Sequence, residues 1–165
     1  MSSREKFLVI SPSWIGDLII SQSLLKHLKQ KHTDCSIDIV VRPDLVELAK
    51  MMPEVDNIYP LDIKHKSLGL AKRYRLAKKI KNNFYSSAII LPNSFKSAII
   101  PWLANIPIRT GYNRELRSIL LTRKYSLIKH EDSMVNRYLK LAKSSYSESI
   151  RPSLEINMEL SNIIR

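Results

Sequence analysis

Cysteine and glycine are scarce in this sequence of 165 residues, and their scarcity excludes several classes of protein. Cys35 is the single cysteine, which rules out an internal disulfide, a CxxC redox pair and a cysteine-based zinc cluster. The three glycines, Gly16, Gly69 and Gly111, cannot form a Walker P-loop or the GxGxxG dinucleotide-binding fingerprint. The usual ATPase and NAD-dependent enzymes are therefore disfavoured, and a reducing compartment fits the cysteine content.

Long hydrophobic runs and histidine metal motifs are also missing. The apolar run near the N-terminus ends at Ser11 and Pro12, before it reaches the length of a signal peptide. The central apolar stretch, 97–108, is broken by Pro101 and Pro107 and is too short for a bilayer core of roughly 30 Å. The four histidines show neither HxxxH nor HExxH spacing, so no metal site is predicted. We expect a protein that is soluble or bound to a membrane only peripherally.

Acidic residues are outnumbered, with 15 Asp and Glu against 27 Lys and Arg, which gives a net charge of +12. The segment 64–81 holds eight cations and no acidic residue, so it supplies eight of these twelve charges. Solvated helix faces usually mix both signs in i, i+4 pairs, so this run favours an anionic partner over simple compositional bias. The charge alone leaves open whether that partner is a phosphorylated lipid surface or a nucleic acid.

Short apolar runs alternate with longer helical patterns, which is typical of βα units and a mainly parallel sheet. The sequence therefore predicts an α/β, Rossmann-like domain over residues 1–150, with helices on both faces of the sheet. Strands are expected at 6–10, 36–41, 57–61, 87–91, 108–111, 125–128 and 154–156. Helices are expected at 17–31, 43–51, 66–81, 95–104 and 132–143, with a helical turn or two at 115–121. The Ser-rich stretch 144–149, followed by Pro152, is interpreted as a linker.

The stretch 11–17, Ser-Pro-Ser-Trp-Ile-Gly-Asp, follows the first expected strand, where a doubly wound sheet binds its ligands. Gly16 indicates a tight turn there or a backbone that approaches a ligand. Asp17 can cap or electrostatically stabilise the next helix, or act as a general base for an attacking hydroxyl. Trp14 can belong to the core or form an apolar wall against a sugar ring. Spacing alone favours the capping and core interpretations.

The stretch 91–98, Leu-Pro-Asn-Ser-Phe-Lys-Ser-Ala, is again an expected strand that leads into a helix. Asn93 or Ser94 can cap that helix, or the exposed amides can bind an anion together with Lys96. Further guanidinium groups that can hold phosphate or carboxylate come with the next strand: Arg109, Arg114 and Arg117. We expect all these groups at one edge of the sheet.

Several stretches together resemble the ADP-heptose:lipopolysaccharide heptosyltransferases, heptosyltransferase II in particular, over nearly the whole chain. They are 11–17 with 21–24, 52–55, 91–98, 106–107 with 109–112, and 137–138. The resemblance implies an inverting, metal-independent glycosyltransferase of the two-domain GT-B fold. It also implies that this chain is the N-terminal, acceptor-binding domain.

The same resemblance assigns roles to residues and partners. Asp17 becomes the general base for the acceptor heptose hydroxyl, a role that is then favoured over a cap alone. The implied acceptor-binding residues are Ser13, Trp14, Gly16, Lys64, Lys66, Arg73, Asn93, Ser94, Lys96 and Arg109. The implied donor is ADP-heptose without any cofactor, and the implied acceptor is heptosyl-Kdo2-lipid A at the cytoplasmic face of the anionic inner membrane. Nucleic acid becomes an unlikely partner.

The family is about twice as long as this chain, and its second domain binds the donor. The resemblance therefore implies that residues 151–165 begin a linker to a donor domain absent from this sequence, which a separate chain could supply. Because nothing here would stabilise the departing ADP, we expect the chain alone to be inactive as a transferase. The alternative is a non-catalytic basic module that binds anionic membrane or nucleic acid.

Overall fold

Six parallel strands form a single sheet in the computed structural model, which describes residues 4–63, 67–126, 133–143 and 151–155. The strands are β1 (Lys6–Ile10), β2 (Ser36–Val41), β3 (Asn57–Pro60), β4 (Ser87–Ile90), β5 (Ile108–Tyr112) and β6 (Arg123–Tyr125). Their order in the sheet is β3-β2-β1-β4-β5-β6, the order of a Rossmann fold. The predicted fold class is confirmed.

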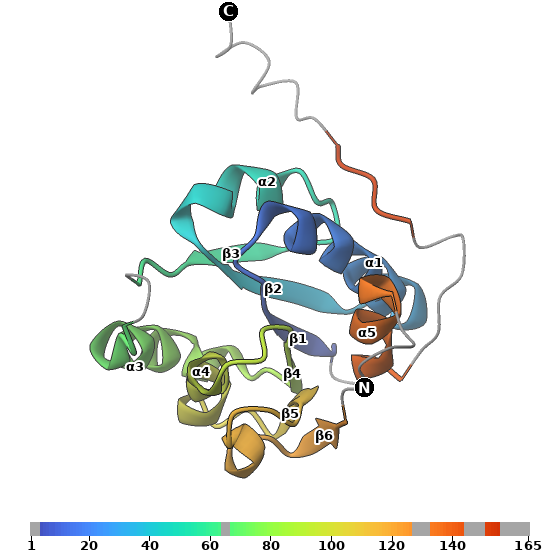
Figure 1. The fold of residues 1–165 in the computed structure, drawn as a ribbon. Helices are drawn as coiled ribbons and strands as arrows, with labels where there is room; N and C mark the ends of the chain where they lie inside the picture. Colours follow the sequence, from blue (N-terminus) through green and yellow to red (C-terminus); the bar gives the residue numbers. More distant parts are fainter. Residues whose placement is uncertain (1–3, 64–66, 127–132, 144–150, 156–165) are drawn as a thin grey trace, which may run out of the picture.

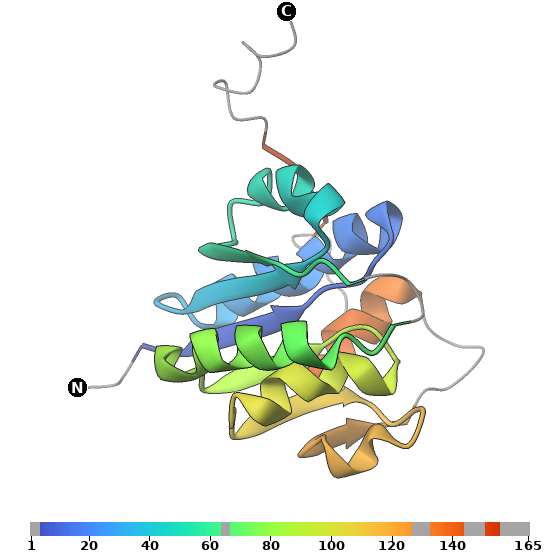
Figure 2. The ribbon, with the colours of Figure 1, turned by 90° about the vertical axis from the view of Figure 1, so that its left-hand side faces the viewer.

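Helices cover both faces of the sheet, as Figures 1 and 2 show. One face packs against α1 (Ile15–Lys31), α2 (Val46–Lys50) and α5 (Met134–Leu141), and the other against α3 (Leu70–Ile80) and α4 (Ile99–Leu103). Short 3-10 turns are η1 (Pro43–Leu45), η2 (Lys81–Asn83), η3 (Phe95–Ala98) and η4 (Arg117–Ile119). Because β1, β2 and β4 lie between two helical layers, they are buried on both faces and consist mostly of apolar residues, although β2 also buries the side chain of Asp38.

Helix α3 begins four residues later than its apolar pattern predicts. Gly69, which directly precedes it, has a φ of +56°, a left-handed conformation in which the chain turns before the helix starts. A Cβ at this position would lie 2.8 Å from the Ile63 side chain. The first residue of the predicted helix, Lys66, lies outside the described residues.

The last part of the chain also differs from its prediction. The edge strand β6 begins at Arg123, before the predicted start at Tyr125, because its position is set by pairing with β5 rather than by an apolar run; positions 127 and 128 lie outside the described residues. Leu154 and Glu155 were expected in a strand but form none; instead the Glu155 amide donates to the Met51 carbonyl at 2.8 Å. Position 156 lies outside the described residues.

Residues 151–155 lie against α1 through side-chain contacts. The Gln22 side chain is fully buried and bonds both backbone groups of Ser153, donating to its carbonyl at 2.6 Å and accepting from its amide at 2.8 Å. Lys26 donates to the Arg151 carbonyl at 2.8 Å. That a linker begins at residue 151 stays a prediction, but these five residues are fixed to the domain.

Candidate functional site

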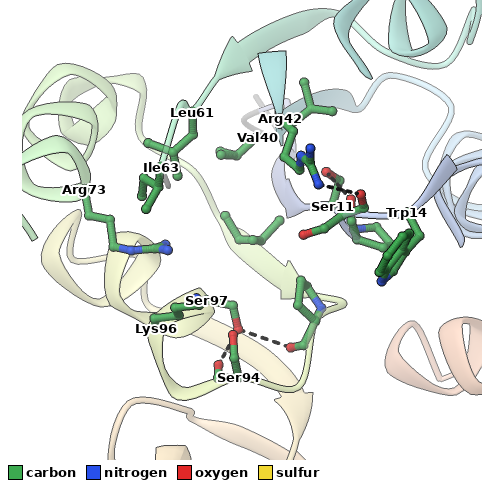
Figure 3. Close-up of a pocket in the computed structure, with 15 residues that line it drawn as sticks. Ser11, Trp14, Val40, Arg42, Leu61, Ile63, Arg73, Ser94, Lys96 and Ser97 are labelled. Carbon is green, nitrogen blue, oxygen red and sulfur yellow. Dashed lines mark hydrogen bonds between the residues drawn. The ribbon is translucent and has the colours of Figure 1, made fainter. Parts of the chain in front are cut away.

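A cleft opens where the chain changes direction at the carboxyl edge of the sheet. From β1 the chain moves toward β2, whereas from β4 it moves toward β5, so the two loops diverge between these neighbouring strands. Ligands of open α/β sheets bind at such a switch point. The cleft has a volume of about 410 Å³ and is lined by the ends of β1 and β2, the segments after β3 and β4, and side chains of α3 and η3 (Figure 3).

The structure brings together about half of the residues predicted to bind a ligand. The predicted residues that line the cleft are Ser13, Trp14, Arg73, Ser94 and Lys96. Those that do not line it are Gly16, Asp17, Asn93 and Arg109. Lys64 and Lys66 lie outside the described residues.

Trp14 differs from the core interpretation that spacing favoured, and Gly16 differs from one of its two alternatives, the tight turn. The Trp14 side chain is 74% exposed, so it is not a core residue; it stands at the rim of the cleft (Figure 3). Gly16 forms no tight turn, because it lies within the first turn of α1 without a positive φ. A Cβ on Gly16 would meet nothing within 4 Å, so its backbone faces open space.

Replacing Gly16 by alanine should separate stability from binding. In the first turn of α1 the substitution should stabilise the fold by up to about 1 kcal/mol, because glycine loses more backbone entropy. If a ligand approaches the open backbone, the added methyl should weaken its binding by roughly tenfold, about 1.4 kcal/mol. Thermal unfolding and ligand titration of the same variant measure the two effects. Unchanged affinity would exclude a close approach at Gly16.

Asp17 lies in the first turn of α1, partly exposed, at the carboxyl edge of the sheet. No side chain caps α1, so the structure does not support a hydrogen-bonded cap; a favourable interaction with the helix dipole remains. Asp17 is close enough to Tyr138 of α5 to influence it: burial raises the pKa of the Tyr138 hydroxyl, and the Asp17 charge raises it further. Tyr138 therefore stays a neutral phenol beside the carboxylate at physiological pH.

Arg73 is the most unusual side chain of the cleft. It is only 6% exposed, yet its guanidinium points into the cavity (Figure 3). Its Nε donates to the Leu68 carbonyl at 2.8 Å, and no carboxylate pairs with it among the residues that the structure describes. Burial lowers the pKa of Arg73, which reflects the cost of holding this charge away from water.

A second cation of the cleft, Arg42, was not predicted. It follows β2 directly, so its place after an expected strand at the ligand-binding edge was the signal that could have revealed it. Its guanidinium forms a pair with Asp44 through two contacts of 3.0 Å, and Nη1 lies 3.4 Å from the Ser13 carbonyl oxygen. Arg42 thus connects the ends of β1 and β2 beside the cavity.

Arg117 stabilises one wall of the cleft, but its side chain does not line the cavity. It is fully buried, and its guanidinium donates to the carbonyl of Pro92, to that of Tyr112 at 2.8 Å and to the Ser97 hydroxyl at 3.0 Å. Burial lowers the pKa of Arg117 to about 10, although the nearby Glu115 charge acts in the opposite direction. A Cβ on Gly111 would lie 3.2 Å from the Arg117 Nη2 atom, so glycine there makes room for the guanidinium.

Two other predicted residues also make structural contacts. The Asn93 side-chain oxygen lies 3.5 Å from Arg117 Nη2 and helps to fix the loop after β4. Arg109 lies at the amino end of β5, away from the cleft, and donates to the carbonyls of Leu120 at 2.7 Å and Ile106 at 2.6 Å. Arg109 therefore links the segment before β5 to the segment before β6 through these two hydrogen bonds.

The composition of the cleft suits an anionic, hydroxyl-rich ligand. Its lining combines an exposed indole, serine hydroxyls and the cations Arg42, Arg73 and Lys96, and the described lining residues include no acidic side chain. Among the described residues, no three His, Cys, Asp or Glu side chains are grouped so that they could hold a metal ion. Within the same ranges, no helix has the length and hydropathy needed to cross a membrane.

Known proteins share both the sequence and the fold. Residues 73–162 match glycosyltransferase family 9 (heptosyltransferase). The chain is 43% identical to lipopolysaccharide heptosyltransferase 2 of Salmonella typhimurium and 40% identical to lipooligosaccharide heptosyltransferase 2 of Haemophilus ducreyi, in each case over 83% of its length. It covers 40% and 39% of these two relatives, respectively.

Solved structures agree with this relationship. The structure of Escherichia coli ADP-heptose lps heptosyltransferase II superposes with a TM-score of 0.83 at 33% identity, over 96% of this chain and 49% of that one. A family 9 glycosyl transferase of Veillonella parvula has the same fold, with a TM-score of 0.81 at 18% identity over 96% of this chain and 47% of that one. The family match, the relatives and the shared fold together establish that this chain belongs to glycosyltransferase family 9, the heptosyltransferases.

Proposed function

We propose that this chain is the acceptor-binding half of an inverting heptosyltransferase that moves heptose from ADP-heptose to heptosyl-Kdo2-lipid A. Relatives named lipopolysaccharide heptosyltransferase 2 support heptose transfer to a lipopolysaccharide, the similar ADP-heptose lps heptosyltransferase II supports the donor, and the chain spans about 40% of the relatives' length. The observation that carries the acceptor assignment is the buried Arg73 guanidinium, directed into a cleft whose described lining has no acidic side chain. An anionic sugar would supply the counter-charge that the domain itself does not.

The cleft residues would bind and orient the acceptor. The cations Arg73 and Lys96 would hold its anionic groups, and the exposed Trp14 ring would lie against a sugar face. Ser13 and Ser94 would offer hydroxyl groups to the sugar. Lys64, Lys66 and Gly16 remain proposed acceptor contacts, whereas Asn93 and Arg109 are left out because their side chains bind Arg117 and backbone carbonyls.

Asp17 is the proposed general base. Its carboxylate would take the proton from the acceptor hydroxyl while the oxygen forms a bond to the anomeric carbon of the donor heptose. The bond from that carbon to ADP breaks on the opposite side, and ADP leaves with the electron pair. Among the described residues the Asp17 carboxylate accepts no hydrogen bond, so it is available to a substrate proton.

The donor site is proposed to lie in a second domain outside these 165 residues, which a separate chain could supply, and no metal or cofactor is proposed. The leaving ADP would be stabilised there, so the 165 residues alone are proposed to be inactive. The acceptor carries a lipid anchor, so we place the reaction at the cytoplasmic face of the inner membrane. The alternative of a non-catalytic basic module is not carried further, because the relatives are transferases.

Replacing Arg73 by methionine tests the acceptor assignment. The affinity of the chain for the soluble heptosyl-Kdo2 glycan should fall by at least about tenfold, because a charge-assisted contact contributes about 1.5–3 kcal/mol. The fold should be little affected, since apolar residues often replace buried charges at no cost. Arg75→Met is the matched control, because Arg75 is exposed on the same helix and does not line the cleft. Equal losses in both variants, measured by calorimetry, would refute a specific role for Arg73.

A further inference from the structure

The outer surface of α3 and α4 carries exposed apolar side chains among cations. On α3, Leu70 and Tyr74 are 55% and 58% exposed, and on α4 Trp102 is 47% exposed. The two helices lie side by side on one face of the sheet (Figure 2). Interfacial aromatic rings with exposed lysines are typical of surfaces that enter the headgroup region of a bilayer.

Two of these apolar residues, Leu70 and Tyr74, form one stripe along α3 together with Lys78 and Lys81. Leu70, Tyr74 and Lys78 follow one another at intervals of four residues, so they share one side of α3, and Lys81 follows three residues later at the start of η2. The side of α3 that packs on the sheet is formed by Arg73, Leu76, Ala77 and Ile80. The stripe lies beside this buried side, and all four of its residues are exposed to solvent.

The charge of this surface has a single sign. Residues 63–114 contain no Asp or Glu, a stretch that includes all of α3 and α4. The two lysines on the other flank of α3 have partners, since Lys72 pairs with Asp62 at 2.8 Å and Lys79 lies over the Tyr59 ring. In the described part of the chain, Lys78 and Lys81 form no ion pair. Their charges are available to an external anion.

We propose that this α3–α4 face, defined by Leu70, Tyr74, Lys78, Lys81 and Trp102, rests on an anionic phospholipid surface. The inference deepens the proposed function and rests on it for the lipid-linked acceptor. Cations alone would suit nucleic acid equally well, but the exposed Leu, Tyr and Trp side chains gain more from a headgroup and acyl-chain boundary.

The position of the cleft relative to this face supports the same partner. Arg73 and Tyr74 are consecutive in α3, yet Arg73 lines the cleft and Tyr74 belongs to the outer stripe. A sugar held by Arg73 would therefore lie beside the same helix that carries the proposed membrane surface. The lipid of the acceptor can remain in the bilayer while its sugar enters the cleft.

Charge reversal on the stripe tests the proposal with vesicles. The Lys78→Glu/Lys81→Glu chain should bind phosphatidylglycerol–phosphatidylethanolamine vesicles at least about 25-fold more weakly, since each lysine near such a surface contributes roughly fivefold. The matched control is Lys31→Glu/Lys124→Glu, which changes the net charge equally at two exposed residues of α1 and β6. Binding is measured by co-sedimentation at low and high salt, and should be absent with phosphatidylcholine.

Removing an aromatic side chain distinguishes insertion into the headgroup region from purely electrostatic binding. Tyr74→Ser should weaken vesicle binding by about fivefold, whereas Ile15→Ser, at a position of α1 that is 61% exposed, should not, because α1 packs on the other face of the sheet. Equal losses in both charge variants, or binding of the chain to duplex DNA but not to vesicles, would overturn the proposal. Vesicle binding needs no acceptor sugar, so this outcome is independent of the Arg73 test.

Discussion

Replacing Asp17 by asparagine should slow heptose transfer by a factor of about 10²–10⁴, the usual contribution of a positioned general base. Asparagine has nearly the same shape but cannot accept the proton of the attacking hydroxyl. Acceptor affinity should change little, because asparagine keeps a side-chain oxygen that can accept a hydrogen bond from the acceptor hydroxyl. The rate is measured in single turnovers, with the chain complemented by the donor-binding half of Escherichia coli heptosyltransferase 2.

The control for Asp17 is Asp34→Asn, the same change at an exposed residue of the loop between α1 and β2. This variant should turn over at the normal rate. If Asp17→Asn matched it, the general base would have to be another group. If acceptor affinity fell together with the rate, Asp17 would be a binding residue rather than a base.

Arg117→Ala should cause the largest loss of stability of any substitution considered, about 3–5 kcal/mol, the usual cost of breaking a buried charged network. It would leave the carbonyls of Pro92 and Tyr112 and the Ser97 hydroxyl without their donor and would open a cavity beside β5. Arg117→Lys should restore only part of this energy, because an ammonium group cannot reproduce the planar fork of donors. Urea unfolding measures both changes.

Arg114→Ala serves as the comparison, because Arg114 is exposed and lies only three residues earlier. It should alter the free energy of unfolding by less than about 0.5 kcal/mol. A similarly small effect of Arg117→Ala would mean that the loop after β4 is held by other contacts. The cleft wall would then not depend on Arg117.

The core strands could be predicted because a strand buried on both faces is rich in apolar residues, and this pattern is visible in the sequence. β1 and β2 consist mostly of apolar residues, and the structure places them at the predicted residues. The start of α3 and the position of β6 were less accessible. The start of α3 is set by the left-handed Gly69 packed against Ile63, and the position of β6 is set by pairing with β5; both depend on packing that the apolar pattern does not contain.

The arginines show why the sequence alone could not identify which cations face the cleft. Arg109 and Arg117 lie in one basic stretch that suggested anion binding, yet both guanidinium groups bind protein oxygens. Arg73, in a run that read as an exposed basic helix, is the buried cation of the cleft. The spacing of charges indicates a basic face, but tertiary packing decides which guanidinium meets a ligand.

The two tryptophans provide the most direct test that the cleft binds the acceptor, because Trp14 lines it and Trp102 lies on α4. In NMR spectra of the chain, addition of the heptosyl-Kdo2 glycan should shift the indole N–H signal of Trp14 and leave that of Trp102 in place. Trp14→Phe identifies the two signals. A Trp14 signal that stays unchanged while the glycan binds would place the acceptor elsewhere and contradict the proposed site.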